Sequence, residues 1–113
     1  MTHLVLLFYL LAGHALADYP LQGDYLAKSK NHRLAGDSAG WQLHLFYHAL
    51  IQGAMVMWLT RSPFLGLAEA LVHGVTDWAK CDGRISGRFD QGVHIASKVL
   101  WMLAAPALTA AGM

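Results

Sequence analysis

Four long apolar segments follow one another along the chain, and each contains a few polar residues at regular spacing. The segments are residues 2–17, 41–60, 63–78 and 89–110. A helix that crosses a membrane needs about 20 mainly apolar residues, with a range of about 17–25. The second and fourth segments meet this length, whereas the first and third reach it only if their polar ends are included. The pattern predicts an all-α, polytopic membrane bundle with about four short transmembrane helices.

The polar residues inside these segments form pairs that are separated by four positions. The pairs are His14/Asp18, His44/His48, His73/Asp77 and Asp90/His94. Residues four apart lie on one face of a helix, one turn from each other. Ionisable side chains in apolar helices are costly to bury and usually serve a function. The pairs are therefore the main candidates for a functional site.

The longest connection lies between the first two apolar segments. Pro20 is expected to end or kink the first helix, because proline lacks the backbone N–H that a helix needs. Residues 21–30 predict a short amphipathic helix at the membrane interface. Residues 36–38, together with Gly40, predict a loop.

Composition supports the membrane interpretation and excludes one class of partner. The chain has 113 residues, which is room for a single domain over residues 1–113. It is 56% hydrophobic and only 13% charged, whereas soluble domains are about 25% charged. A net charge of +1 argues against nucleic-acid binding. Membrane lipid is the expected partner, and a homo-oligomer is compatible with the composition.

Basic residues predict the orientation of the helices. They are concentrated in the first connection (Lys28, Lys30, Arg33) and the third (Lys80, Arg84, Arg88), while the second has only Arg61. Basic connections stay in the cytoplasm, so both termini are expected outside. All four polar pairs then lie at the cytoplasmic end of the bundle, which allows one common site.

The N-terminal segment has a competing interpretation as a secretory signal peptide. Residues 15–17 resemble a signal-peptidase site after a short apolar run. The first three residues, however, supply no Lys or Arg, and cleavage would separate His14 from Asp18. We therefore interpret this segment as a retained helix.

The two halves of the chain resemble each other. His14 and Asp18 precede an aromatic residue, as do His73 and Asp77, and the His44/His48 pair corresponds to Asp90/His94. This internal similarity predicts two helical hairpins related by a pseudo-twofold axis along the membrane normal, as in parallel membrane repeats. The four pairs would then surround one axis.

Histidine and aspartate together suit a divalent metal. Imidazole nitrogen and carboxylate oxygen are ligands for zinc, manganese and iron(II), and one or two ions would fit the number of ligands. The same residues would also suit a proton or metal-ion pathway. Two further alternatives are a purely structural polar core and haem with two axial histidines, although haem leaves the aspartates unexplained.

Motifs over nearly the whole chain resemble a known family. They are residues 14–22, Lys30-Asn31, residues 48–50, residues 73–80 and residues 90–94, in this order. The chain is similar to the small bacterial and phage membrane proteins known as domain of unknown function 3307. The resemblance implies a polytopic helical membrane protein of the bacterial inner membrane and supplies no function. Its hallmark residues include Gln22, Asn31 and Gln91, but not His44. A looser similarity exists to predicted membrane-bound metal-dependent hydrolases.

These observations lead to one principal hypothesis and one alternative. We expect a divalent-metal site at the cytoplasmic face that hydrolyses a lipid head group or another phosphoester. The expected ligands are His14, Asp18, His48, His73, Asp77 and His94. Asp90 would act as general base or further ligand, Lys80 would contact an anionic substrate, and Gln22, Asn31 and Gln91 would hold the ligands in place. The alternative is a small transporter, channel or holin-like oligomer that uses the same residues.

Overall fold

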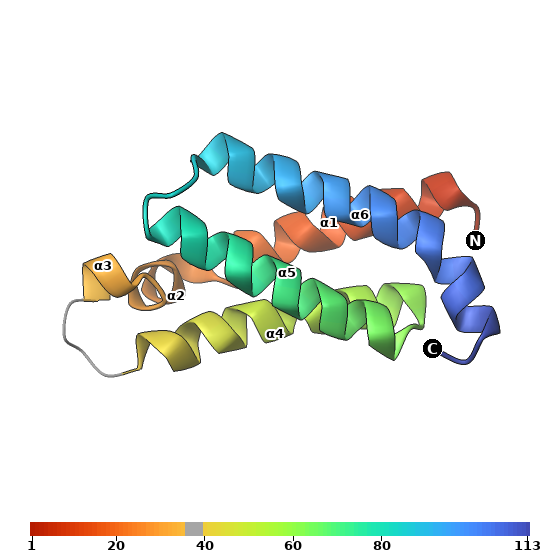
Figure 1. Ribbon diagram of the computed structural model, residues 1–113, viewed down its shortest axis with the longest axis horizontal. Coiled ribbons are helices and arrows are strands. Elements are labelled where there is room, and N and C mark those ends of the chain that lie inside the picture. The colour runs from red at the N-terminus through yellow and green to blue at the C-terminus, as the bar shows by residue number, and fades with distance from the viewer. Residues whose placement is uncertain (36–39) are drawn as a thin grey trace.

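Six α-helices lie in the part of the chain that the computed structural model describes, residues 1–35 and 40–113 (Figure 1). They are α1 (His3–Asp18), α2 (Gly23–Ser29), α3 (His32–Ala35), α4 (Trp41–Thr60), α5 (Pro63–Cys81) and α6 (Gly87–Ala110). None of these residues forms a β-strand. The predicted all-α class is therefore confirmed.

Hydroxyl side chains start three of the long helices. The Thr2 side chain accepts a hydrogen bond from the Val5 backbone N–H at the start of α1. Ser62 does the same for α5, where Pro63 occupies the first turn, and Ser86 does so for α6. Such caps satisfy N–H groups that have no partner inside the helix, so the three hydroxyl side chains help to set where these helices begin.

The connection between α1 and α4 turns away from the axis of the bundle, with α2 bent by 79° from α1. Helix α1 ends at Asp18, before Pro20, as expected for a residue that breaks helices. Helix α2 begins at Gly23, whose φ of 65° lies in the left-handed region that favours glycine. The loop predicted at residues 36–38 lies outside the described residues.

The long helices α1, α4, α5 and α6 form an up-and-down bundle (Figure 1), and the structure as a whole measures 46 × 25 × 23 Å. Helix α4 packs against α1 and α5, and α6 packs against the same two helices from the other side. Helices α2 and α3 and the 82–86 turn lie at one end of the bundle, and both termini lie at the other. We call these the α2–α3 end and the terminal end.

The bundle buries polar residues and exposes apolar ones. Leu67 and Leu71 on α5 are 67% and 69% exposed, whereas Glu69 and His73 on the same helix are 0% exposed. Apolar burial is concentrated toward the terminal end, in a cluster formed by Leu6, Leu10, Val56, Leu65, Trp101, Met102 and Ala105. Most of the other large buried side chains are ionisable or amide side chains. This distribution is the reverse of that in soluble domains.

The prediction of four membrane spans is not confirmed by length and apolar composition alone. Among the described helices only α6 qualifies, and α1 with α2 would qualify as a broken span bent by 79°. The reason is physical. Helix α1 has only 16 residues, His48 and Gln52 lower the mean hydropathy of α4, and three charged residues interrupt α5.

Candidate metal centre

Polar stripes on the four long helices meet inside the α2–α3 half of the bundle. Because residues four apart share a helix face, each stripe points in one direction. The stripes are His14/Asp18 on α1, His48/Gln52 on α4, Glu69/His73/Asp77 on α5 and Asp90/His94/Lys98 on α6, and all ten residues are buried. The helices thus build one polar interior from four separate segments.

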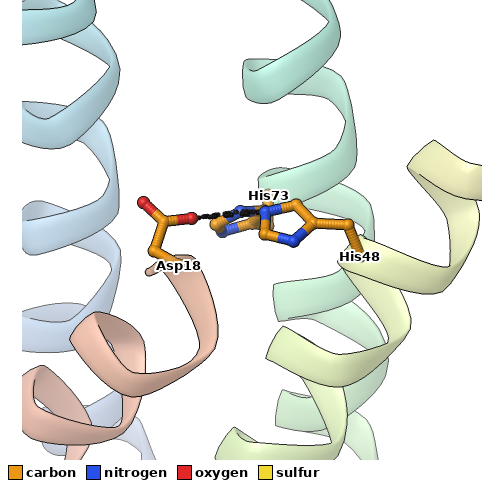
Figure 2. Close-up of side chains that lie close together, drawn as sticks. All are labelled: Asp18, His48 and His73. Atoms are coloured by element: carbon orange, nitrogen blue, oxygen red, sulfur yellow. Dashed lines mark hydrogen bonds and ion pairs between the residues drawn. The ribbon is translucent and has the colours of Figure 1, made fainter. Parts of the chain in front are cut away.

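Three side chains form a compact triangle at the centre of this interior, each from a different helix (Figure 2). His73 Nε2 lies 3.0 Å from His48 Nε2 and 3.6 Å from Asp18 Oδ1. His48 Nε2 lies 3.2 Å from the same aspartate oxygen. Donor atoms that surround one ion at about 2.1 Å are roughly 3.0–3.4 Å apart. Two sides of the triangle fall in this range and the third, at 3.6 Å, is slightly longer, so the triangle is close in size to a metal-ligand set.

Asp77 lies next to the triangle and is held by two lysines. Its Oδ2 is 3.6 Å from His48 Nε2. Lys30, which is buried at the end of α2, donates to Asp77 Oδ2, and Lys80 Nζ lies 3.1 Å from Asp77 Oδ1. Asp77 is thus placed to be a fourth ligand whose charge is partly neutralised by ammonium groups.

His14 and Gln91 form one wall of the centre and orient Asp18. Gln91 Nε2 donates to Asp18 Oδ2 at 3.0 Å, and Gln91 Oε1 lies 3.1 Å from His14 Nε2. His14 Nε2 itself is 3.8 Å from Asp18 Oδ2. The second oxygen of Asp18 is therefore fixed by an amide while its first oxygen belongs to the triangle.

His94 and Asp90 lie beside this wall, with the His14 and His94 ring centroids 5.0 Å apart. Asp90 Oδ1 lies 3.1 Å from His94 Nε2, and the His94 ring stacks on His73 with centroids 4.0 Å apart. Lys80 Nζ approaches Asp90 Oδ2 at 3.6 Å. A carboxylate on one ring nitrogen commonly fixes a histidine whose other nitrogen binds metal. The other nitrogen, His94 Nδ1, has no hydrogen-bond partner among residues 1–35 and 40–113.

Three residues singled out from the sequence lie away from the central side chains. The Gln22 side chain donates to the Asp18 backbone oxygen and so holds the end of α1. The Asn31 side chain accepts from the backbone N–H groups of Arg33 and Leu34 and caps α3. His44 is half-buried against Tyr25, with ring centroids 5.6 Å apart.

Four buried residues of the centre were not predicted from the sequence: Lys30, Gln52, Glu69 and Lys98. Gln52 donates to Asp18 Oδ1 at 3.3 Å, and Lys98 Nζ donates to Glu69 Oε1 at 2.6 Å. Three of the four continue the four-residue spacing by one further turn, so that spacing would have found Gln52, Glu69 and Lys98. Lys30 lies in the long connection, where the sequence marks it as a basic residue and as part of a family motif but not as a partner of Asp77.

A smaller polar group joins α3 to the turn after α5. Asp82 Oδ1 lies 2.8 Å from His32 Nε2, and Arg84 Nε donates to Asp82 Oδ2 at 2.7 Å. The hydrogen bonds from His32 and Arg84 lower the pKa of the Asp82 carboxyl below its ordinary value. The His32 ring also stacks on Trp78, with centroids 5.7 Å apart. This group fixes the α2–α3 end and lies outside the candidate centre.

Comparison with known proteins identifies a family but no characterised relative. The sequence profile of a family described as protein of unknown function (DUF3307) matches residues 6–111. This confirms the resemblance drawn from the sequence motifs, whereas the looser similarity to metal-dependent hydrolases is unsupported. No curated protein and no solved structure matches the chain.

Proposed function

The chain belongs to the DUF3307 family, and we propose that it is an integral membrane protein with a divalent-metal site that hydrolyses a phosphoester at the cytoplasmic face. The observation that carries this proposal is the triangle of Asp18, His48 and His73. A lipid head group is the expected substrate, because the site would open at the membrane surface. The ion would be zinc, manganese or iron(II).

The distribution of exposed residues supports placement in a membrane. Helices α4, α5 and α6 have 20, 19 and 24 residues, which matches the thickness of the hydrocarbon core. Large apolar side chains cover their outer faces, including Phe46, Leu71 and Leu103, each more than half exposed. In water such a surface would promote aggregation, whereas in a bilayer it would contact apolar lipid chains. The four long helices would cross the bilayer, with α1 the shortest.

Small residues support the same placement. Helices α4 and α5 approach so closely that a Cβ added at Gly53 would lie 2.5 Å from the Gly66 carbonyl oxygen. Close packing through glycine and alanine is a common way for helices to associate in lipid, where burial of apolar surface gives no driving force. The interface between α4 and α5 has this character.

The orientation of the bundle follows from its basic residues. The α2–α3 end carries Lys28 and Arg33 in one connection and Arg84 and Arg88 near the 82–86 turn. The positive-inside rule places this end in the cytoplasm. The candidate centre, which lies in the same half of the bundle, would then face the cytoplasm, and both termini would face outward.

The residues around the triangle suit hydrolysis. A bound divalent ion lowers the pKa of a coordinated water, which supplies hydroxide near neutral pH. Lys80, whose side chain is 33% exposed, bridges the buried Asp77 and Asp90 to the surface and is placed to hold a phosphate oxygen. Asp90, bonded to His94, is placed to accept a proton or to become a further ligand.

An ion or proton pathway is the second candidate, and one observation favours it. Glu69 and Lys98 carry the polar interior further toward the terminal end than the histidine pairs do. A pathway must continue across the whole bilayer, however, and the apolar cluster around Leu10, Val56 and Leu65 follows directly. A holin-like or channel-forming oligomer would have to open this cluster. Ion flux into liposomes that contain the purified protein would support this candidate.

Metal analysis of detergent-purified protein tests the principal proposal. We expect near-stoichiometric metal in the wild type and its loss in His73→Ala and Asp77→Ala. His44→Ala is the matched control, because His44 belongs to a histidine pair of α4 but lies outside the triangle; His3→Ala is a second, exposed control. Equal metal content in all four variants would contradict the ligand assignment.

Hydrolysis is tested with phospholipid vesicles and a soluble phosphodiester as parallel substrates. We expect release of a phosphorylated head group from the vesicles that stops when a chelator removes the metal and returns when the metal is restored. Lys80→Ala should raise the KM of the reaction, since Lys80 is placed to bind the substrate. Metal-free wild type that remains active would refute the metal-dependent mechanism.

A further inference from the structure

The Lys98 ammonium group is enclosed by the protein much as a bound cation would be. It donates to Glu69 Oε1 at 2.6 Å, to the Ser97 hydroxyl at 3.3 Å and to the His94 carbonyl oxygen at 3.4 Å. The side chain is 1% exposed. Trp101 Nε1 donates to the other Glu69 oxygen at 2.6 Å. Every partner that the structure gives Lys98 is therefore an oxygen acceptor, as around a metal ion.

Glu69 belongs at the same time to a second group of metal-ligand type. Glu69, His73 and His94 are all buried, and one ligand atom from each lies within 4.8 Å of the others. The Glu69 oxygen that accepts from Lys98 also lies 3.4 Å from His73 Nδ1. His73 Nε2 points to the Asp18/His48/His73 triangle. The second triad thus meets the first triangle at His73.

The positive charge of Lys98 beside Glu69 Oε1 changes what this second triad can bind. A metal ion held by Glu69 would lie a few ångströms from the ammonium, and like charges repel strongly where water is excluded. The ammonium also occupies one of the lone pairs that the ion would need. Lysine and a second metal ion are therefore alternatives at this position.

We infer that Lys98 is a built-in cation that closes a latent second metal site formed by Glu69, His73 and His94. The native centre then holds a single ion, at Asp18, His48 and His73. It would act as a one-metal site and not as a two-metal clamp, in which paired ions hold the attacking and leaving oxygens. The position of the first ion rests on the proposed function, whereas the closure of the second triad rests on Lys98 alone.

The inference is tested by counting ions per chain with zinc and manganese as probes. We expect one ion in the wild type, two in Lys98→Met, and one again in the double variant Lys98→Met/Glu69→Gln, which removes both charges. Lys28→Met is the matched control, because Lys28 is exposed on α2, and it should keep one ion. Lys98→Gln, which removes the charge but retains a donor for Glu69, should gain the second ion more weakly.

Two results obtained with folded protein would overturn the inference: two ions in the wild type, or no additional ion in a folded Lys98→Met. If Lys98→Met folds only when metal is added, while the double variant folds without it, the metal replaces the missing charge and the inference stands. A variant that neither metal restores counts against it. A wild type without metal would refute the proposed function instead, and Lys98→Met gaining one ion over that wild type would still support the closure.

Discussion

His73 is the residue at which the two groups of ligand-type side chains meet. Its Nε2 faces His48 and Asp18, and its Nδ1 faces Glu69. The side chain is 1% exposed, and a neutral imidazole can donate from only one of its two nitrogens. A metal ion at the triangle would bind Nε2 and leave the proton on Nδ1, directed at Glu69. Metal binding and the orientation of His73 are therefore coupled.

Gln91 should control metal affinity without being a ligand. Gln91→Leu removes the amide that donates to Asp18 and contacts His14. Loss of such an orienting partner typically weakens metal binding 10–100-fold, and we expect a decrease in that range by titration with a competing chelator. Gln42→Leu, on an exposed position of α4, is the matched control. Unchanged affinity in Gln91→Leu would show that Asp18 is held by other contacts.

The Asp82 group should give a pH-dependent contribution to stability. The pKa of the Asp82 carboxyl is lowered in the folded chain by His32 and Arg84. The stabilisation of the fold by the ionised carboxylate is therefore complete above the unfolded pKa of about 3.9. The contribution is lost as the pH falls through the lowered native pKa. We expect the melting temperatures of wild type and Asp82→Asn to differ at pH 7 and to converge at acid pH.

The control for this experiment is Asp24→Asn, because Asp24 is exposed on α2 and makes no ion pair with the described residues. Its melting temperature should follow that of the wild type at both pH values. A difference between wild type and Asp82→Asn that grows on acidification would contradict the assignment of the lowered pKa.

The sequence located many residues of the centre because helical spacing is a local property. His14, Asp18, His73 and Asp77 were each found from a partner one turn away. Glu69 and Lys98 were missed because only pairs were considered, although each continues a stripe. Lys30 was beyond reach for a different reason, since its contact with Asp77 joins residues 47 positions apart. A side chain in a connection reveals such a contact only after the chain has folded.

At the scale of elements, the interface between α4 and α5 is set by backbone contact. Gly53 and Gly66 face each other so closely that neither position has room for a side chain. The Ala49 side chain and Gly74 continue this close approach toward the polar centre, since a Cβ added at Gly74 would lie 3.3 Å from the Ala49 Cβ. The interface therefore fixes the separation of His48 and His73, which lie on these two helices.

Gly53→Ala should separate the two helices. The added Cβ would lie 2.5 Å from a backbone oxygen, which cannot rotate away, and overpacking of this kind typically costs about 1–3 kcal/mol. Gly92→Ala is the control, because it has nothing within 4 Å in α6 and should gain up to about 1 kcal/mol from helix propensity. Unfolding in mixed detergent measures both. Equal stability of the two variants would contradict the packing.

The boundaries of the elements show where local patterns stop being informative. The predicted helix over residues 41–60 coincides with α4, and the first differs from α1 by one residue at each end. Helix α5 continues to Cys81, beyond the predicted end at Trp78, because the turn is made at Gly83, which has a φ of 76°. Lys80 was assigned to a basic connection, although its contacts with Asp77 and Asp90 hold it inside the helix.

At the scale of the whole molecule, burial and hydropathy give different answers about the membrane. The length and composition of each helix taken alone select α6, because α1 is too short and the polar residues of α4 and α5 lower their apolar content. The bundle as a whole turns these stripes inward and presents an apolar surface. The hydropathy of a single helix does not report this arrangement, because it averages over all faces of the helix, whichever face points to the interior.

The proposed orientation predicts the location of the C-terminus. Alkaline phosphatase fused after Met113 should be active, because it folds only outside the cytoplasm, and a fluorescent protein at the same position should be dark. The chain should also remain in the membrane fraction after extraction at alkaline pH. A fluorescent C-terminal fusion with inactive phosphatase would reverse the orientation and place the candidate centre outside.

The sharing of hydrogen bonds among all four long helices has a consequence for synthesis of the chain. Asp18 on the first helix accepts from Gln91 on the last, 73 positions later, and Glu69 on α5 receives Lys98 and Trp101 only from α6. Until the ribosome has released α6, Asp18 lacks the Gln91 amide, and Glu69 lacks the Lys98 ammonium and the Trp101 N–H. A chain that stops before Gly87 therefore lacks these hydrogen-bond donors, and quality-control proteases should remove it while they spare the finished protein.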